Sequence, residues 1–383
     1  MSLFARGLAI ENYRSVRRLR LPVERLSVFL GANGVGKTNL YRALQLLQGA
    51  AAGTLGADLA GEGGLGSAFW AGPTRRTEDR RIRLEVDLGP LPADAPGPSA
   101  YSYAVEVGYP QKGTAAAFRQ EPQIKEETAV FRHGRREIKL LERRGPQLVA
   151  RDEAGRRVDV DADLMASETA LGRLADPSRF PDLQLIRQTL LDWRFYHDLR
   201  TDAGSPLRQP ALAVASPTLA SDGANLAAVF ATLAHIREDT AALDDAIAHA
   251  FPGARLVTPE PERAATFGMT FPDFPQRVFE ASELSDGTLR FLGLAGALLA
   301  YRLPAFVALN EPEASLHPDL LAPLGRLIAQ AAERTQVWVV THSEPLAAAI
   351  EAHGAVRPRT VRKEAGATTI AGLKFGAFED EED

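Results

Sequence analysis

The sequence contains no cysteine, and methionine and tryptophan each occur only three times among its 383 residues. The absence of cysteine excludes a disulfide framework and every cysteine-ligated zinc or iron–sulfur site. No apolar run approaches the length of a membrane span, and the first ten residues lack the apolar core of a signal peptide. Because the net charge is only −5, nucleic-acid binding would require a local basic patch. We therefore expect a soluble cytoplasmic protein without membrane contact.

The most informative stretch is residues 31–38, Gly-Ala-Asn-Gly-Val-Gly-Lys-Thr. It fits the phosphate-binding loop pattern, and an apolar strand-like run precedes it while a helix-like run follows. Glycines let the backbone N–H groups turn toward phosphate oxygens, and the next helix adds its positive N-terminal end. Lys37 would reach the outer phosphates of ATP, and the Thr38 hydroxyl would ligate Mg²⁺. The residues expected to contact the nucleotide are Asn33, Gly34, Val35, Gly36, Lys37, Thr38 and Asn39.

Hydrophobic periodicity divides the rest of the chain into alternating elements. Three short strands are expected before residue 31 and a helix after it, followed at 49–72 by a glycine- and alanine-rich stretch typical of a mobile loop. Alternating segments between 81 and 160 predict an antiparallel sheet inserted after the helix, and two helical pieces follow between 164 and 193. After residue 286 helices and strands alternate, which predicts a parallel sheet flanked by helices. No internal repeat and no coiled-coil heptad run is visible.

Three stretches in the C-terminal third carry polar groups at the ends of predicted elements. In chain order these are Ser285, Asp286 and Gly287 at a helix start, Asn310, Glu311 and Glu313 after strand 305–309, and His342 after strand 337–341. The helix start would offer N–H groups and a hydroxyl to phosphate. The acidic and amide groups would suit a metal and an attacking water. Each stretch alone is weak evidence for a functional site, since an apolar strand is more often part of the core and a lone histidine more often has a structural role.

Together, and in this order, these stretches resemble the ABC-type ATPases, in the branch that includes RecF, SMC proteins and OLD-type ATPases. The resemblance also rests on the opening Ile-Glu-Asn-Tyr-Arg-Ser-Val at 10–16, on Asn33 and Asn39, and on the Leu-Ser-Asp-Gly and Glu-Pro-Glu-Ala-Ser-Leu-His-Pro runs. Bacterial RecF-like predicted ATPases carry a Ser-Asp-Gly-x-Asn-Leu segment before the signature, as at 221–226 here. The resemblance covers 1–48 and 220–350 well, and 50–200 only in outline.

The resemblance implies an α/β fold, an ABC-type ATPase head whose mixed or parallel sheet is flanked by helices. This head would be split between residues 1–48 and 254–375. A β-rich and helical insertion at 49–200 and a helical region at 201–253 would separate the phosphate loop from the signature. Residues 376–383 would form an acidic tail.

The resemblance also implies a head-to-head homodimer in which two subunits sandwich two nucleotides. Ser285, Asp286 and Gly287 would then act in trans on the nucleotide of the partner. Glu311 matches the general base, His342 matches the histidine that contacts the γ-phosphate, and Glu313 and His317 match a loop at the dimer interface. Arg14 matches an arginine near the nucleotide, although it could equally face solvent beside its arginine neighbours.

One position departs from the family pattern. Asn310 stands where the family has an aspartate that helps to hold Mg²⁺, so the metal would depend on Thr38 and Asn310. An amide accepts a hydrogen bond from a metal-bound water but brings no negative charge to the cation. This predicts slow hydrolysis unless Glu311 or Glu313 supplies part of the charge. The glutamine that couples the γ-phosphate to the inserted domain could be Gln123 or Gln209.

Arginines are frequent in the insertion, at Arg75, Arg76, Arg80, Arg81, Arg83, Arg132, Arg135, Arg136, Arg143, Arg144, Arg156 and Arg157. On hairpins they could track a phosphate backbone, but carboxylates lie among them, so a solvated charged face is an equal alternative. No aromatic-interleaved motif for reading bases is visible. Binding to double-stranded DNA would therefore be independent of sequence.

The preferred hypothesis is a RecF/SMC-like ATPase that works as an ATP-dependent dimer on DNA, in repair or phage defence. The alternative is a slowly hydrolysing, nucleotide-gated module that recruits an effector partner. OLD-type nucleases carry a nuclease domain after the ATPase, whereas few residues follow His342 here. Any nuclease activity would have to come from a separate partner.

Overall fold

The computed structural model describes residues 3–73, 80–90, 100–110, 118–134, 136–161, 163–174 and 176–373. Its internal contacts divide the chain into two compact units. The first unit contains residues 1–24, 31–193 and 359–383, and the second contains 25–30 and 194–358. This division cuts the chain at places other than the expected boundaries at 48, 200 and 253. The acidic tail at 376–383 lies outside the described residues.

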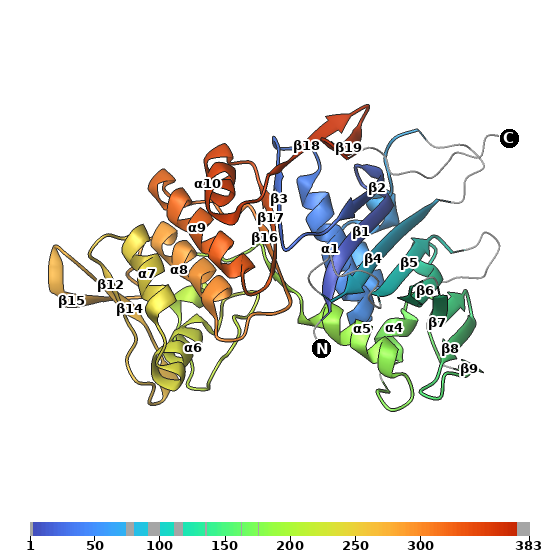
Figure 1. Cartoon of the computed structure of the whole chain (residues 1–383), viewed down its shortest axis with the longest axis horizontal. Helices are drawn as coiled ribbons and strands as arrows, with labels where there is room; N and C mark the ends of the chain where they lie inside the picture. The colour runs from blue at the N-terminus through green and yellow to red at the C-terminus, as the bar shows by residue number, and fades with distance from the viewer. Residues whose placement is uncertain are drawn as a thin grey trace. The chain divides into compact units, whose positions relative to one another are not determined.

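The first unit is built on an eight-stranded antiparallel sheet, labelled along its length in Figure 1. Its order is β2-β1-β4-β5-β6-β7-β8-β9. The strands are β1 (Phe4–Tyr13), β2 (Val16–Pro22), β4 (Arg81–Gly89), β5 (Ala100–Gly108), β6 (Gln123–His133), β7 (Arg136–Arg144), β8 (Gln147–Arg151) and β9 (Arg157–Asp159). The antiparallel strands predicted between 81 and 160 are therefore confirmed. They do not form a sheet of their own, because β4 pairs with β1 from Phe4 to Glu11 and so extends the N-terminal hairpin.

The described residues of the first unit form the helices α1 (Lys37–Ala52), α2 (Leu55–Gly61), α3 (Gly64–Ala68), α4 (Ala170–Arg173) and α5 (Pro181–Asp192). The two helical pieces predicted between 164 and 193 are confirmed as α4 and α5. The mobile loop predicted at 49–72 is wrong, because α2 and α3 occupy most of it. Leu55, Leu59 and Leu65 are buried there, so apolar packing outweighs the low helix propensity of glycine. Gly53 and Gly63 separate the helices in the left-handed conformation that glycine adopts without strain.

The first unit also includes an antiparallel hairpin that the sequence did not suggest. It consists of β18 (Arg359–Glu364) and β19 (Ala367–Ile370), and β19 lies against β2. The backbone N–H of Thr368 donates to the carbonyl of Ser15 at 2.7 Å. The C-terminal hairpin is thereby attached to the turn between β1 and β2.

The second unit contains four parallel strands in the order β10-β16-β17-β3. They are β10 (Arg194–Tyr196), β16 (Phe306–Asn310), β17 (Gln336–Thr341) and β3 (Leu26–Leu30). Its helices are α6 (Leu226–Ala231), the π-helical turn η2 (Thr232–Arg237), α7 (Ala241–Ala250), α8 (Asp286–Leu299), α9 (Leu321–Ala332) and α10 (Glu344–Gly354), with 3₁₀ turns η1 (Pro206–Arg208) and η3 (Pro318–Leu320). Helices α9 and α10 pack on β17, and α8 packs on α9 (Figure 1). The predicted parallel sheet flanked by helices is confirmed.

Short antiparallel strands complete the second unit. β11 (Ala211–Leu212) pairs with β13 (Ala264–Ala265), and β14 (Gly268–Phe271) lies between β12 (Arg255–Val257) and β15 (Phe274–Glu280). Strand β15 leads directly toward the signature stretch before α8.

The parallel strands of the second unit end together. Register pairs Asn310 of β16 with Val340 of β17, and Thr341 of β17 with Leu30 of β3. Polar groups at the carboxyl ends of parallel strands gather at one edge of the sheet, which is where such sheets bind ligands. Glu311 and His342 therefore follow neighbouring strands at the same edge, and the chain enters the phosphate loop directly after β3.

Candidate active site

The phosphate loop of the first unit leads into a helix start that no side chain of the described residues caps. Gly34 and Gly36 have φ values of +82° and +97°, and α1 begins immediately afterwards at Lys37. Within the described residues α1 has no side-chain cap, and its first turn has no acidic residue. The N–H groups and positive dipole end of a sixteen-residue helix are thus available to an anion.

Lys37 is buried at this helix start. Its ammonium group donates to the carbonyls of Gly31 at 2.7 Å and Ala32 at 2.8 Å. These contacts hold the ammonium over the loop. A phosphate bound in the loop would therefore meet a positive charge that is already in place.

Three side chains from distant parts of the first unit hold the loop. The Asn39 amide donates to the Ser15 hydroxyl at 2.6 Å, which lies 2.7 Å from the Thr368 hydroxyl. The Thr368 hydroxyl donates to the carbonyl of Val35 at 2.8 Å. A Cβ on Gly36 would lie 2.0 Å from the Thr368 oxygen, so only glycine fits there. No local sequence signal points to Thr368, because it lies more than three hundred residues from the loop.

Arg14 is engaged by a carboxylate. Its Nε and Nη2 lie 3.1 Å and 2.7 Å from one oxygen of Glu62, which also accepts from the Tyr13 hydroxyl at 2.8 Å. Arg42 donates to the other oxygen at 3.1 Å. Burial, followed by the negative charge of Glu62, raises the pKa of the Tyr13 phenol. The alternative in which Arg14 simply faces solvent is therefore wrong, and its contact with the nucleotide stays a prediction.

A carboxylate and histidine cluster forms at the strand edge of the second unit. One oxygen of Glu313 accepts from the Thr341 hydroxyl at 2.5 Å and from the His342 backbone N–H at 3.1 Å. The His342 Nδ1 lies 3.3 Å from this oxygen and 3.5 Å from a carboxylate oxygen of Glu311. Glu311 and His342 thus lie together, and their roles in hydrolysis stay predictions. Glu313, expected on an interface loop, is only 8% exposed and holds the end of β17 within its own subunit.

The backbone at Glu311 has an unusual conformation. Its φ is +48°, a left-handed value that costs about 1–3 kcal/mol for a non-glycine residue. Its N–H donates to the carbonyl of Val340 at 2.8 Å, and its carbonyl accepts from Arg290 of α8 at 3.4 Å. Burial lowers the pKa of the Arg290 guanidinium. The sequence pattern suggested no role for Arg290, which links the signature helix to Glu311.

Two oxygens in this cluster have no hydrogen-bond partner among the described residues. They are Oδ1 of Asn310 and Oε2 of Glu313, and both are buried. Such unsatisfied acceptors suit a hard cation or a water bound to it. Within the described chain no group of three histidine or acidic side chains is arranged to hold a metal. The residues present therefore fit Mg²⁺ that arrives with nucleotide phosphates better than a metal held by protein alone.

The signature residues lie at the N-terminus of α8. The Ser285 hydroxyl accepts from the Thr288 N–H at 3.2 Å, so it caps its own helix. The Asp286 carboxylate accepts from Arg208 at 2.7 Å, and Gly287 follows in the first turn. His317 is exposed and caps η3. Gln123 begins β6 and Gln209 follows η1, and the choice between them as coupling residue stays open.

Most described arginines of the insertion are paired with carboxylates. Ion pairs join Arg81 to Glu106 and Glu126, Arg83 to Glu85 and Glu106, Arg132 to Asp87 and Glu137, Arg143 to Glu127, Arg144 to Glu142, Arg156 to Asp152, and Arg157 to Glu142. This pairing favours the solvated charged face over a continuous basic track. Arg75, Arg76 and Arg135 lie outside the described residues.

Residues 26–349 match the family model described as "AAA domain, putative AbiEii toxin, Type IV TA system". The chain belongs to this family. The matched residues include the phosphate loop, the signature and both polar strand ends. The chain is accordingly a P-loop ATPase domain. No curated protein matches it.

Solved SMC heads share the fold of this ATPase domain. A head "bound to the C-winged helix domain of ScpA" is 14% identical, with a TM-score of 0.53 over 97% of this chain and 98% of that one. A head with an extended coiled coil, bound to the C-terminal domain of ScpA derived from Pyrococcus furiosus, is 13% identical, with a TM-score of 0.51 over 97% and 96%. The predicted fold, an ABC-type ATPase head, is thus confirmed. In the described part of the chain no helix is both long and apolar enough to cross a bilayer.

Proposed function

We propose that this ATPase domain binds ATP with Mg²⁺ and hydrolyses it slowly in a head-to-head homodimer. The uncapped start of α1, with Lys37 buried beside it, is the observation that carries the proposal. In the dimer, the signature of one subunit acts on the nucleotide of the other. Because phosphoryl transfer depends mainly on positioning and charge neutralisation, such a site couples hydrolysis to association.

The residues at the carboxyl edge of the parallel sheet have different roles in ATP hydrolysis. Glu311 orients and deprotonates the attacking water, and its strained backbone fixes where its carboxylate lies. His342 contacts the γ-phosphate and is held by Glu313. Thr38 and Asn310 would hold Mg²⁺ when it arrives with ATP, the Thr38 hydroxyl directly and the buried Asn310 oxygen through a water, and the ion would supply positive charge to the phosphates. The amide adds no negative charge, which supports slow turnover.

Action on double-stranded DNA, in repair or phage defence, is the first proposal for the role of the dimer. Because the insertion arginines are paired with carboxylates, we expect only weak binding to DNA. The affinity for DNA should fall steeply as the salt concentration rises. The neutral amide of Asn310 favours a second candidate, a nucleotide-gated module that holds ATP and recruits an effector or a separate nuclease.

Steady-state ATP hydrolysis with and without double-stranded DNA, at low and physiological salt, separates the two. Stimulation by DNA would favour the DNA-working ATPase. Low turnover in both conditions, raised about tenfold or more in Asn310→Asp, would favour the gated module. Lys37→Ala is the control that should abolish nucleotide binding.

Dimer formation is measured by light scattering during gel filtration. Glu311→Gln should trap an ATP-bound dimer that wild type forms only transiently. If this variant neither slowed hydrolysis nor dimerised with ATP, the assignment of Glu311 and the dimer would both be wrong.

A further inference from the structure

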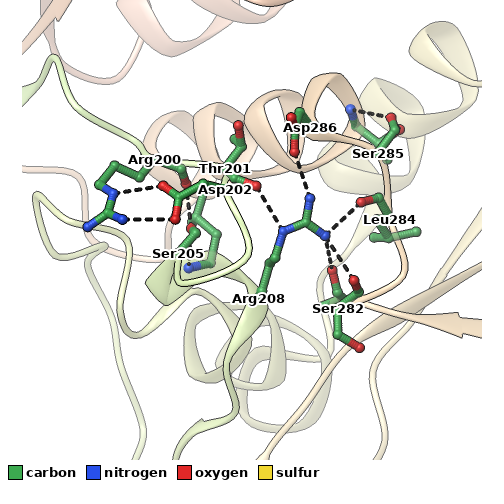
Figure 2. Close-up of polar contacts among 12 residues, drawn as sticks. Arg200, Thr201, Asp202, Ser205, Arg208, Ser282, Leu284, Ser285 and Asp286 are labelled. Carbon is green, nitrogen blue, oxygen red and sulfur yellow. Dashed lines mark hydrogen bonds and ion pairs between the residues drawn. The ribbon is translucent and has the colours of Figure 1, made fainter.

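Arg208 reaches the signature stretch from a distant part of the second unit (Figure 2). It lies at the end of η1, a turn that Ser205 caps and Pro206 begins. Leu207, between Pro206 and Arg208, is fully buried. The turn is therefore anchored, and the side chain of Arg208 leaves it in a defined direction.

The guanidinium group of Arg208 bonds on both sides of Ser285. Before Ser285, Nη1 donates to the carbonyls of Ser282 at 2.9 Å and Leu284 at 2.8 Å. After Ser285, Nη2 donates to the Asp286 carboxylate at 2.7 Å. The Nε donates to the carbonyl of Thr201 at 2.8 Å, which fixes the plane of the group. A planar, five-donor guanidinium can satisfy such divergent acceptors at once, whereas a lysine ammonium cannot.

The Arg208 side chain contacts one side of the signature stretch. A cavity of about 340 Å³ lies there, lined among others by Arg208, Phe267, Val278, Ala281 and Ser282. The Arg208 side chain is only 12% exposed, whereas Asp286 is 61% exposed. The partly buried bonds to the carbonyls of Thr201 and Leu284 therefore count for more than the water-exposed pair with Asp286.

We propose that Arg208 is a positioning residue that sets the shape of the signature stretch, so that Ser285 and Gly287 can meet the nucleotide of the partner subunit. This inference rests on the proposed dimer. It also gives Asp286 a role different from the one expected. The Asp286 carboxylate is an anchor for Arg208 within its own subunit, and it does not contact phosphate.

Arg200 provides a matched control. It precedes η1, and its guanidinium is likewise bound to a carboxylate, with both contacts to Asp202 at 2.8 Å (Figure 2). This pair is exposed, at 55% and 52%, and the contacts drawn for it do not reach the signature stretch. Arg200→Ala therefore removes an arginine and an ion pair nearby without touching the contacts of Arg208.

The test compares Arg208→Ala, Arg200→Ala and Asp286→Asn, each combined with Glu311→Gln so that ATP is not consumed. We expect Arg208→Ala to leave the affinity of the monomer for ATP within about twofold, and to weaken ATP-dependent dimerisation about tenfold to a hundredfold, because charge-assisted hydrogen bonds are lost. Arg200→Ala should change neither. Asp286→Asn keeps an oxygen that accepts from Arg208, so it should dimerise within about threefold of the parent.

Hydrogen exchange of the backbone amides of residues 281–288, without nucleotide, provides the second measurement. Arg208→Ala should speed exchange there, and Arg200→Ala should not. If the Glu311→Gln parent fails to dimerise with ATP, the proposed function is overturned and this inference with it. If the parent dimerises and Arg208→Ala dimerises equally well, only the role of Arg208 is overturned. Should Arg208→Ala not fold, Arg208→Lys takes its place, and unchanged exchange and dimerisation in that variant would equally overturn the proposal.

Discussion

Removing the side chain of Glu313 should destabilise the second unit strongly, whereas removing only its charge should not. Glu313→Ala leaves the Thr341 hydroxyl and the His342 N–H without their acceptor. Each buried donor that loses its partner costs about 1–3 kcal/mol, so the unfolding free energy should fall by about 2–6 kcal/mol. For a unit of this size, at about 2–4 °C per kcal/mol, that corresponds to a decrease of about 4–24 °C in Tm.

Glu313→Gln keeps an oxygen in the same place and should retain both hydrogen bonds. Its amide group replaces the unpartnered Oε2, so the change in stability should stay within about 1 kcal/mol. The negative charge 3.3 Å from His342 is lost, however, and we expect kcat to fall about tenfold with little change in the KM for ATP. The two variants thus separate the structural contribution of the carboxylate from its chemical one.

Thermal unfolding followed by circular dichroism, together with steady-state ATP hydrolysis, measures both effects. If Glu313→Gln lowered Tm as much as Glu313→Ala, the acceptor role would not explain the stability. If Glu313→Ala unfolded within 2 °C of wild type, the two hydrogen bonds would contribute nothing measurable. Unchanged kcat in Glu313→Gln would refute the idea that this charge holds His342 for catalysis.

Two further predictions concern the first unit. Thr368→Val removes the hydroxyl that donates to the Val35 carbonyl, so the Kd for ATP, measured by calorimetry, should rise about tenfold. Thr368→Ser keeps a hydroxyl and should bind ATP with the wild-type Kd. Equal affinity in all three proteins would mean that the hairpin of β18 and β19 does not shape the loop. Glu127→Ala should lower the unfolding free energy, measured in urea, by about 3–5 kcal/mol. The fully buried carboxylate accepts from two backbone N–H groups of α4 and from Tyr103, and it lies 3.9 Å from buried Arg143. A decrease below about 1 kcal/mol would contradict this reasoning.

Local sequence patterns determined much of this protein. The glycine spacing of residues 31–38 and its strand and helix neighbours predicted a loop that the structure places before α1, because backbone conformation there depends on the residues themselves. Strand alternation predicted β4 to β9, and the buried runs 305–309 and 337–341 predicted parallel neighbours. Their shared edge then followed from topology, and with it the approach of Glu311 to His342.

Tertiary packing decided what no local pattern encodes. The glycine- and alanine-rich stretch at 49–72 has little periodicity, and only burial of its leucines makes it helical. Pairing of β1 with β4 joins the insertion to the N-terminal hairpin. Thr368 on the phosphate loop, Glu62 on Arg14 and Arg208 on the signature each join residues far apart in the chain. Such contacts depend on the summed packing of whole elements, so only the folded chain could reveal them.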